Sequence, residues 1–217
     1  MPTRSVLYDF DGTLADSFAA IAGSTNHVRR VYGLPPLAEA EVRRFVGHGL
    51  HALMETLVPV APAEAAIAAY RAHHADTMLA GTRLLPGVAD TLAELARRGY
   101  RQAVCSNKRV EFTRALVAAL GVGDHLPTVL GPDDVGVPKP HPAMLLEAAR
   151  RLGAAPAECI YVGDMAVDVE AGKAADMPVW LVPGGAGDPA EALAAGPTRV
   201  LTTFADLLDL LPGAAAG

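Results

Sequence analysis

The chain contains few cysteines, few aromatic residues and little charge. Its 217 residues include two cysteines, 5% aromatic residues and 19% charged residues, against 51% hydrophobic residues. Cys105 and Cys159 both lie in apolar, strand-like stretches, so we expect small buried thiols rather than a disulfide or a nucleophile. The length and apolar content suit one large or two unequal globular domains and argue against disorder.

Long hydrophobic runs and basic clusters are also missing. No apolar stretch reaches the roughly 18 residues of a membrane span, and no signal-like segment precedes the first apolar run, so we expect a cytoplasmic protein with no membrane partner. The net charge is −6, and no run of Lys and Arg is longer than two residues. Nucleic acid is therefore not an expected partner. The oligomeric state stays open between a monomer and a homodimer.

Two aspartates stand two positions apart at the end of the first apolar run. Val6-Leu7-Tyr8 is typical of a buried strand, and Asp9-Phe10-Asp11-Gly12-Thr13 follows it directly. Open α/β sheets bind ligands at the carboxyl ends of their strands, so Asp9 and Asp11 are candidate catalytic residues. Two carboxylates this close repel each other unless a cation lies between them or one is protonated. Mg²⁺ fits the first case and a general acid the second, while a solvated turn is the structural alternative.

The pattern further along the chain predicts helices inserted into an α/β fold. Residues from about 16 to 82 show no strand pattern and predict three helices, near 17–32, 40–58 and 63–80, with prolines between them. From about residue 84, helices alternate with strands near 101–105, 128–130, 159–163 and 178–182, which predicts a doubly wound parallel sheet. We expect a core of residues 1–15 and 83–217 and an all-helical cap of residues 16–82. The hinges would lie near Ala15-Asp16 and residues 81–86.

Further reactive side chains follow the later strands. Ser106 and Asn107 come after strand 101–105, Asp164 and Asp168 come after strand 159–163, and Lys139 lies between prolines in a loop. If the sheet forms as predicted, four aspartates share one cleft, which demands a divalent cation. Taken singly, Lys139 would fit a surface lysine and Asp164 a helix N-cap. Their joint occurrence at strand ends favours a single site.

With these residues the chain resembles the haloacid dehalogenase superfamily, and within it the phosphoglycolate phosphatase-like group. The four motifs of that superfamily appear in order as residues 9–17, 106–108, 139–142 and 163–168. Residues 44–50 also resemble the Val-Gly-x-Gly segment of phosphoglycolate phosphatases, which lies on the cap face that closes over the substrate. Two positions depart from the pattern: Met165 replaces a small polar residue, and Asp176 replaces a helix-closing glycine. Asp tolerates the left-handed backbone conformation well, so we expect only a small stability cost there.

The resemblance implies a Rossmann-like core and a Mg²⁺-dependent phosphatase that acts through an aspartyl-phosphate, with 2-phosphoglycolate as the best guess for its substrate. By this resemblance Asp9 is the nucleophile and Asp11 the general acid and base. Mg²⁺ would be bound by Asp9, the backbone carbonyl of Asp11 and Asp164, with Asp168 in support. The phosphoryl group would be bound by Ser106, Lys139 and backbone N–H groups near Gly12 and Asn107.

The cap supplies the remaining candidate residues of the site. It is rich in histidine and arginine, which fits a small anionic substrate. Among these residues His48, between Gly47 and Gly49, is the first candidate for a substrate contact, followed by Arg43. A phosphomutase of the β-phosphoglucomutase type, or a non-catalytic binding protein on the same fold, is the alternative function.

Overall fold

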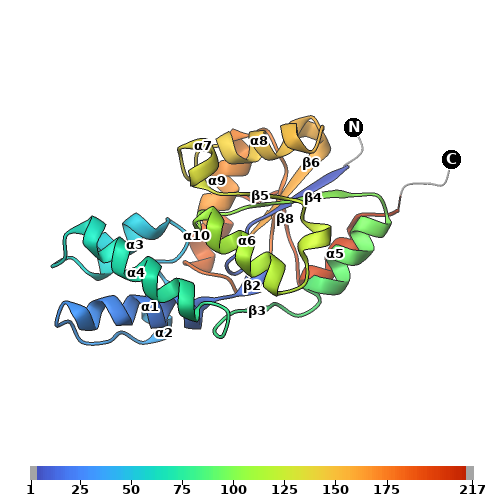
Figure 1. Cartoon of the computed structure of the whole chain (residues 1–217). Coiled ribbons are helices and arrows are strands. Elements are labelled where there is room, and N and C mark those ends of the chain that lie inside the picture. Colours follow the sequence, from blue (N-terminus) through green and yellow to red (C-terminus); the bar gives the residue numbers. More distant parts are fainter. Residues whose placement is uncertain (1–3, 214–217) are drawn as a thin grey trace.

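Strand β1 (Ser5–Tyr8) lies in the middle of a six-stranded parallel sheet in the computed structural model, which describes residues 4–213 (Figure 1). The strand order is β5-β4-β1-β6-β7-β8, and every pair of neighbours runs parallel. The other five strands are β4 (Arg101–Cys105), β5 (Thr128–Leu130), β6 (Cys159–Gly163), β7 (Val179–Leu181) and β8 (Arg199–Val200).

Helices cover both faces of this sheet, which explains why β1 is a continuous buried run. Val6 and Tyr8 point into one hydrophobic core, together with residues of α5 (Val88–Arg97) and α6 (Val110–Ala119). Leu7 points into a second core with residues of α8 (Ala143–Arg151) and α9 (Ala166–Ala174). The short helices α7 (Pro132–Val135), α10 (Pro189–Ala194) and α11 (Leu207–Leu210) complete this part. The predicted doubly wound α/β fold is confirmed.

Four helices lie between the two strands of a small antiparallel ribbon in the sequence. The ribbon pairs β2 (Ala15–Asp16) with β3 (Arg83–Leu84). Between them lie α1 (Phe18–Val31), α2 (Glu39–Arg43), α3 (Leu50–Leu57) and α4 (Ala63–Thr77). Figure 1 shows these four helices, called the cap below, grouped at the left beside the sheet. The predicted domain boundaries fall within the ribbon; the division into two domains stays a prediction.

The prediction of one helix over residues 40–58 is wrong. Residues 44–49 leave the helical path between α2 and α3, with φ of 111° at Gly47 and 88° at Gly49. A positive φ is incompatible with a continuing right-handed helix. A Cβ on Gly47 would also lie 2.2 Å from the sulfur of Met165, so this loop approaches the core closely. Six other elements were not predicted, and each is only two to six residues long: β2, β3, β8, α7, α10 and α11.

The structure also bears on the predictions for Asp176 and for the two cysteines. Asp176 has a φ of 56° directly after α9, so it does adopt the left-handed conformation expected there. Cys105 and Cys159 are free and buried, as predicted. Within residues 4–213, no helix combines the length and the hydrophobicity that crossing a membrane requires.

The packing of α9 against β7 gives a stability prediction. A Cβ on Gly172 of α9 would lie 2.1 Å from Cγ2 of Val179, whereas one on the exposed Gly23 of α1 would meet nothing within 4 Å. Gly172→Ala should therefore lower the free energy of unfolding by about 1–3 kcal/mol despite alanine's better helix propensity. Gly23→Ala should raise it by up to about 1 kcal/mol. Urea denaturation measures both; equal stabilisation of the two variants would contradict the close packing.

Candidate active site

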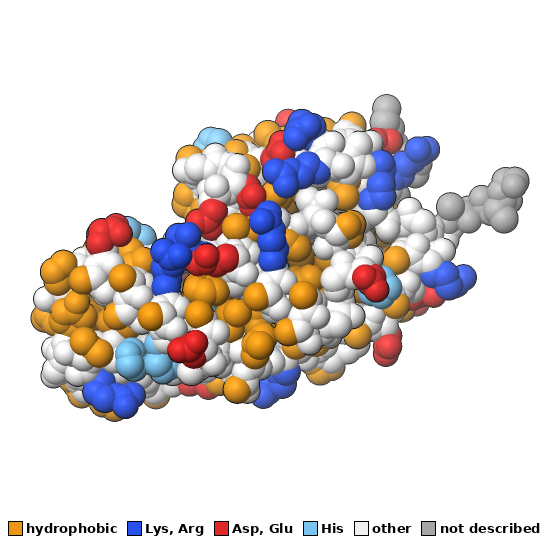
Figure 2. Space-filling model, in the orientation of Figure 1, with side chains coloured by type: hydrophobic (Ala, Val, Ile, Leu, Met, Phe, Trp, Pro, Cys, Tyr) orange, Lys and Arg blue, Asp and Glu red, His pale blue; other side chains and the backbone are white. Residues whose placement is uncertain are grey.

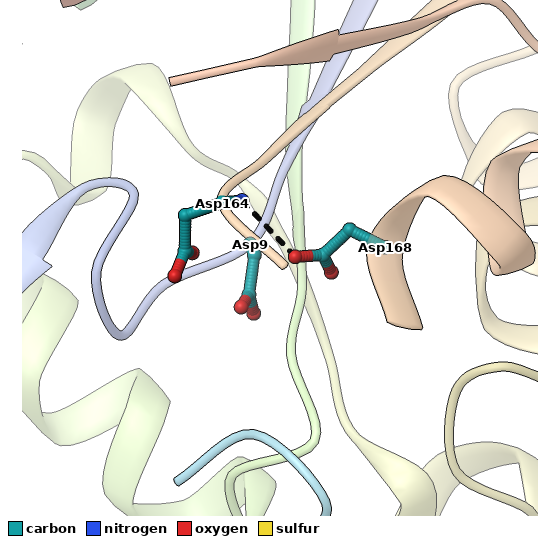
Figure 3. A group of neighbouring side chains, drawn as sticks. All are labelled: Asp9, Asp164 and Asp168. Carbon is teal, nitrogen blue, oxygen red and sulfur yellow. Dashed lines mark hydrogen bonds between the residues drawn. The ribbon is translucent and has the colours of Figure 1, made fainter. Parts of the chain in front are cut away.

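The carboxyl ends of β1, β4 and β6 bring most of the predicted site residues together. Asp9 follows β1, Ser106 follows β4 and Asp164 follows β6, and all three are buried. Carboxylate oxygens of Asp9, Asp164 and Asp168 lie within 4.8 Å of one another. Figure 3 shows the carboxylates of Asp9 and Asp164 side by side, pointing toward the same space, while Asp168 reaches in from α9. The predicted acidic cluster therefore forms, with the Asp11 carboxylate outside it.

Lys139 is the cation of this cluster. Its Nζ lies 3.0 Å from Oδ1 of Asp9 and 2.7 Å from Oδ1 of Asp168, and it donates a 2.7 Å hydrogen bond to the Tyr161 hydroxyl. Its side chain is only 1% exposed. Burial alone would lower the pKa of Lys139, but the charges of Asp168 and Asp9 outweigh it and raise the pKa above its ordinary value. The lysine is thus a permanent ammonium.

Asp168 is fully engaged by the protein. Its Oδ1 meets Lys139 and the Tyr161 hydroxyl, and its Oδ2 accepts hydrogen bonds from the backbone N–H groups of Asp164 (3.1 Å) and Met165 (3.0 Å). With two partners on each oxygen, the Asp168 carboxylate is poorly suited to be a direct metal ligand. Asp168 instead fixes the position of Lys139 and the turn after β6, which agrees with the supporting role that the resemblance implies.

Asp9 and Asp164 have fewer hydrogen-bond partners than Asp168, so their oxygens can accept a further ligand. Burial raises the pKa of Asp9 to about 6; Lys139 opposes this shift, while the charges of Asp168 and Asp11 add to it. Burial, Asp168 and Asp9 likewise raise the pKa of Asp164 well above its ordinary value, against hydrogen bonds from Thr13 Oγ1 (2.6 Å) and the Ala186 N–H (2.7 Å).

These two carboxylates fit a divalent metal ion. Among the described residues, Oδ1 of Asp9 receives no hydrogen bond, although it forms the ion pair with Lys139. Two buried carboxylates with raised pKa values are stabilised when a cation joins them. Their oxygens are the hard donors that Mg²⁺ and similar ions take. The residues present therefore suit a divalent metal at this place.

Asp11 belongs to a separate group with Lys108, a residue to which the sequence analysis gave no role. Lys108 Nζ lies 3.2 Å from each Asp11 carboxylate oxygen, and Ser17 Oγ donates a 2.5 Å hydrogen bond to Oδ1. Both side chains are largely buried, at 6% and 10% exposure. The only sequence signal for Lys108 was its place directly after Ser106-Asn107, because its partner lies 97 residues away.

Gly12 and Asn107 hold parts of the site in position, and phosphate binding by backbone N–H groups near them stays a prediction. The N–H of Gly12 donates to the Ala15 carbonyl at 2.8 Å, so it is not free for a phosphoryl oxygen. Glycine is required there because a Cβ would lie 2.6 Å from Oδ2 of Asp164, at a φ of 89°. The Asn107 side chain exchanges two hydrogen bonds with the backbone of Lys139 (2.8 and 3.0 Å) and donates one to the Gly47 carbonyl (2.9 Å). It links the lysine loop to the cap.

A small cavity of about 50 Å³ connects the two carboxylate groups to the cap. Its core side includes Asp9, Asp11, Ser106, Asn107 and Lys108. Its cap side is mainly apolar and is formed by residues 45–47, 49 and 50 with Ile21, Leu53, Tyr70 and His74. At the surface, basic and acidic side chains lie next to one another near the junction of cap and core (Figure 2). Arg71 of α4 pairs with Glu111 of α6 at 3.0 Å.

A family model described as a haloacid dehalogenase-like hydrolase matches residues 6–182. The chain belongs to this family. It is 34% identical to a phosphoglycolate phosphatase of Pectobacterium atrosepticum, over 96% of this chain and 92% of that one. It is 36% identical to one of Yersinia pseudotuberculosis, over 94% and 91% respectively. The predicted resemblance to phosphoglycolate phosphatase-like hydrolases, and with it the prediction of a phosphoric monoester hydrolase, is confirmed.

Solved structures agree with this assignment. A predicted phosphoglycolate phosphatase from Haemophilus somnus superimposes with a TM-score of 0.90 at 25% identity, covering 97% of this chain and 98% of that one. CbbY from Rhodobacter sphaeroides, solved in complex with phosphate, superimposes with a TM-score of 0.83 at 25% identity, covering 96% and 99%. Both matches extend over the cap as well as the core of this haloacid dehalogenase-like hydrolase.

The two cap residues predicted to touch the substrate lie elsewhere in this hydrolase. His48 lines a different cavity, of about 470 Å³, together with Arg44, Met165 and the start of α10. Arg43 donates hydrogen bonds to the carbonyls of Gly184 and Gly185, and its guanidinium lies 4.1 Å from the centre of the Phe18 ring. Arg43 therefore joins the cap to the core. The sequence pattern indicated the right loop but not which of its sides faces Asp9.

The raised pKa of Asp9 predicts how the metal-free protein responds to pH. Because the folded-state pKa is above the unfolded one, the protonated carboxyl favours folding at low pH, and this contribution is lost as the pH rises through about 6. Asp9→Asn should therefore be more stable than the wild type in EDTA at pH 8, by about 2–3 kcal/mol, and by less at pH 5. Chemical denaturation at both pH values measures this. An advantage that shrinks with rising pH would mean that the Lys139 ion pair outweighs burial.

Proposed function

We propose that this phosphatase uses Mg²⁺, bound by Asp9 and Asp164, to hydrolyse a small phosphate monoester, in the first place 2-phosphoglycolate, through an aspartyl-phosphate on Asp9. The observation that supports this most is the position of the Asp9 carboxylate. It lies at the carboxyl end of the central strand, 3.0 Å from the Lys139 ammonium, in a cavity that it shares with Asp11. A carboxylate held in this way is well placed to attack phosphorus.

The proposed reaction has two displacements at phosphorus. In the first, an Asp9 oxygen forms a bond to phosphorus while the bond to the ester oxygen breaks, and Asp11 gives that oxygen a proton. In the second, a water attacks the phosphorus, Asp11 takes back a proton from it, and the bond between phosphorus and Asp9 breaks to release phosphate. When bound, Mg²⁺ supplies charge neutralisation for the carboxylates and the phosphoryl oxygens.

The remaining residues position the reacting groups and neutralise their charge. The Ser106 hydroxyl lines the cavity and can donate to a phosphoryl oxygen, whereas the Lys139 ammonium, which already contacts Asp9, Asp168 and Tyr161, would share a donor with the phosphoryl group. Ser17 and Lys108 hold the Asp11 carboxylate apart from the acidic cluster. This separation leaves Asp11 free of the metal ligands, as a group that moves protons must be.

The proposed substrate rests on two observations. The relatives at 34% and 36% identity are named phosphoglycolate phosphatases and match nearly the whole chain. The cavity is small and mainly apolar on its cap side, which suits a compact leaving group. A phosphomutase would differ by keeping its phosphoryl-enzyme intact in water, so phosphate release separates the two functions.

The direct test is phosphate release by the purified protein. After exhaustive dialysis against EDTA it should be inactive, and Mg²⁺ should restore hydrolysis of 2-phosphoglycolate in preference to glycerol phosphate and hexose phosphates. Asp9→Asn should lose activity by at least about a thousandfold, because the amide keeps the shape and removes the nucleophile. Full activity in EDTA would refute the metal proposal. Activity of Asp9→Asn within tenfold of wild type would refute the aspartyl-phosphate.

The proton-transfer role of Asp11 predicts a trapped intermediate. With p-nitrophenyl phosphate, whose leaving group needs no proton, Asp11→Asn should still be phosphorylated on Asp9 but hydrolyse that adduct at least about a hundredfold more slowly. Rapid quenching followed by mass spectrometry should find the adduct on the peptide that contains Asp9. The double variant with Asp9→Asn is the control and should carry none. An equally strong signal in the control would place the phosphoryl group elsewhere.

A further inference from the structure

Helix α4 of the cap presents an aromatic pair to the catalytic cavity. Tyr70 and His74 are one helical turn apart, so they lie on the same face of α4. Both line the cavity that contains Asp9 and Asp11, and their ring centres are 5.0 Å apart. His74 also meets the edge of the Phe112 ring at 5.1 Å and is only 1% exposed. The imidazole is therefore fixed between two aromatic rings.

A chain of contacts favours a proton on Nε2 of His74. If the Thr77 hydroxyl donates to the His73 carbonyl at 2.9 Å, it accepts at its 3.3 Å contact with Nδ1 of His73. Nδ1 of His73 is then protonated and donates to Ser24 Oγ at 3.2 Å as well. Ser24 in turn has its own proton for Nδ1 of His74, at 3.0 Å. This leaves the proton of His74 on Nε2.

The surroundings of His74 keep its ring neutral. Burial, and after it the charge of Lys108, lower the pKa of His74 to about 3, against the opposing effects of the Asp11 charge and the Ala20 carbonyl. A neutral imidazole has one N–H and is uncharged at physiological pH.

Nε2 of His74 has no hydrogen-bond partner among the described residues, although it is buried. Buried polar groups in folded proteins almost always have a partner. Apart from Tyr70, the cap residues that line the cavity beside it offer only apolar side chains and backbone. The acceptors on the core side of the cavity, the Asp11 carboxylate among them, form no hydrogen bond with Nε2 either, so a molecule that enters the cavity can supply the partner.

We propose that Nε2–H of His74 is a substrate-binding donor that reads an acceptor oxygen in the leaving-group half of the ester. The carboxylate of 2-phosphoglycolate is such an acceptor. This inference rests on the proposed function and assigns to α4 the specificity that the sequence pattern had placed at His48. The catalytic core would bind the phosphoryl group of any ester, whereas His74 would distinguish esters by what lies beyond the ester oxygen.

Two substitutions separate the two nitrogens of the ring. His74→Gln can place an amide N–H near the position of Nε2, whereas His74→Asn reaches only the position of Nδ1. The quantity to compare is the ratio of kcat/KM for 2-phosphoglycolate to kcat/KM for ethyl phosphate, which lacks the carboxylate. His74→Asn should lower this ratio ten- to a hundredfold, and His74→Gln should keep it within about fivefold of wild type. His51→Asn, on the exposed side of α3, is the matched control and should not change the ratio.

The outcomes distinguish this inference from the proposed function. If the wild type does not hydrolyse 2-phosphoglycolate with Mg²⁺, the proposed substrate is wrong and the inference falls with it. If the wild type does so but His74→Asn leaves the ratio unchanged, or His74→Gln lowers it as much, His74 has only a structural role. The donor role can also be tested without substitutions. Nitrogen-15 NMR of the wild-type histidines should show His74 protonated on Nε2, and a proton on Nδ1 would overturn the donor role.

Discussion

The ammonium group of Lys139 is the interaction on which the active site depends. Three buried carboxylates lie close together at the carboxyl ends of the central strands, and Lys139 contacts two of them, Asp9 and Asp168. Removing the lysine would leave both carboxylates without a cation, and an uncompensated buried charge typically costs about 3–5 kcal/mol. One cation against three carboxylates still leaves an excess of negative charge. That excess of negative charge favours the binding of a divalent metal ion at this site.

The same lysine is held from two directions that belong to different strands. Asp168 fixes its ammonium from the segment after β6, and Asn107 fixes its backbone from the segment after β4. Asn107 then continues to the Gly47 carbonyl of the cap. The loop of Lys139 is thus linked to Asp9 on one side and to the cap loop at Gly47 on the other through a few short polar contacts.

Much of this could be predicted from the sequence, for physical reasons. A strand buried on both faces is a continuous apolar run, so β1, β4 and β6 were evident, and the polar residues that follow them had to meet at one edge. The break at Gly47 and Gly49 was missed because an apolar spacing suited to a helix runs on through residues 40–58, although two glycines this close weaken a helix. The ribbon of β2 and β3 is too short to have a pattern. The pair of Lys108 with Asp11 and the burial of His74 depend on tertiary contacts, which local sequence does not contain.

The antiparallel ribbon of β2 and β3 has a consequence for how such an enzyme diversifies. Both crossings between core and cap leave the sheet side by side, and Arg83 pairs with Asp16 at 2.7 Å across them. The cap is thus an insertion into the core whose two ends lie next to each other, and the free-energy cost of closing such a loop grows only slowly with its length. A different helical insert could therefore be joined to the core at the β2–β3 ribbon without disturbing the carboxylates or the lysine. Substrate range and chemical step are thereby separately adjustable parts of one chain.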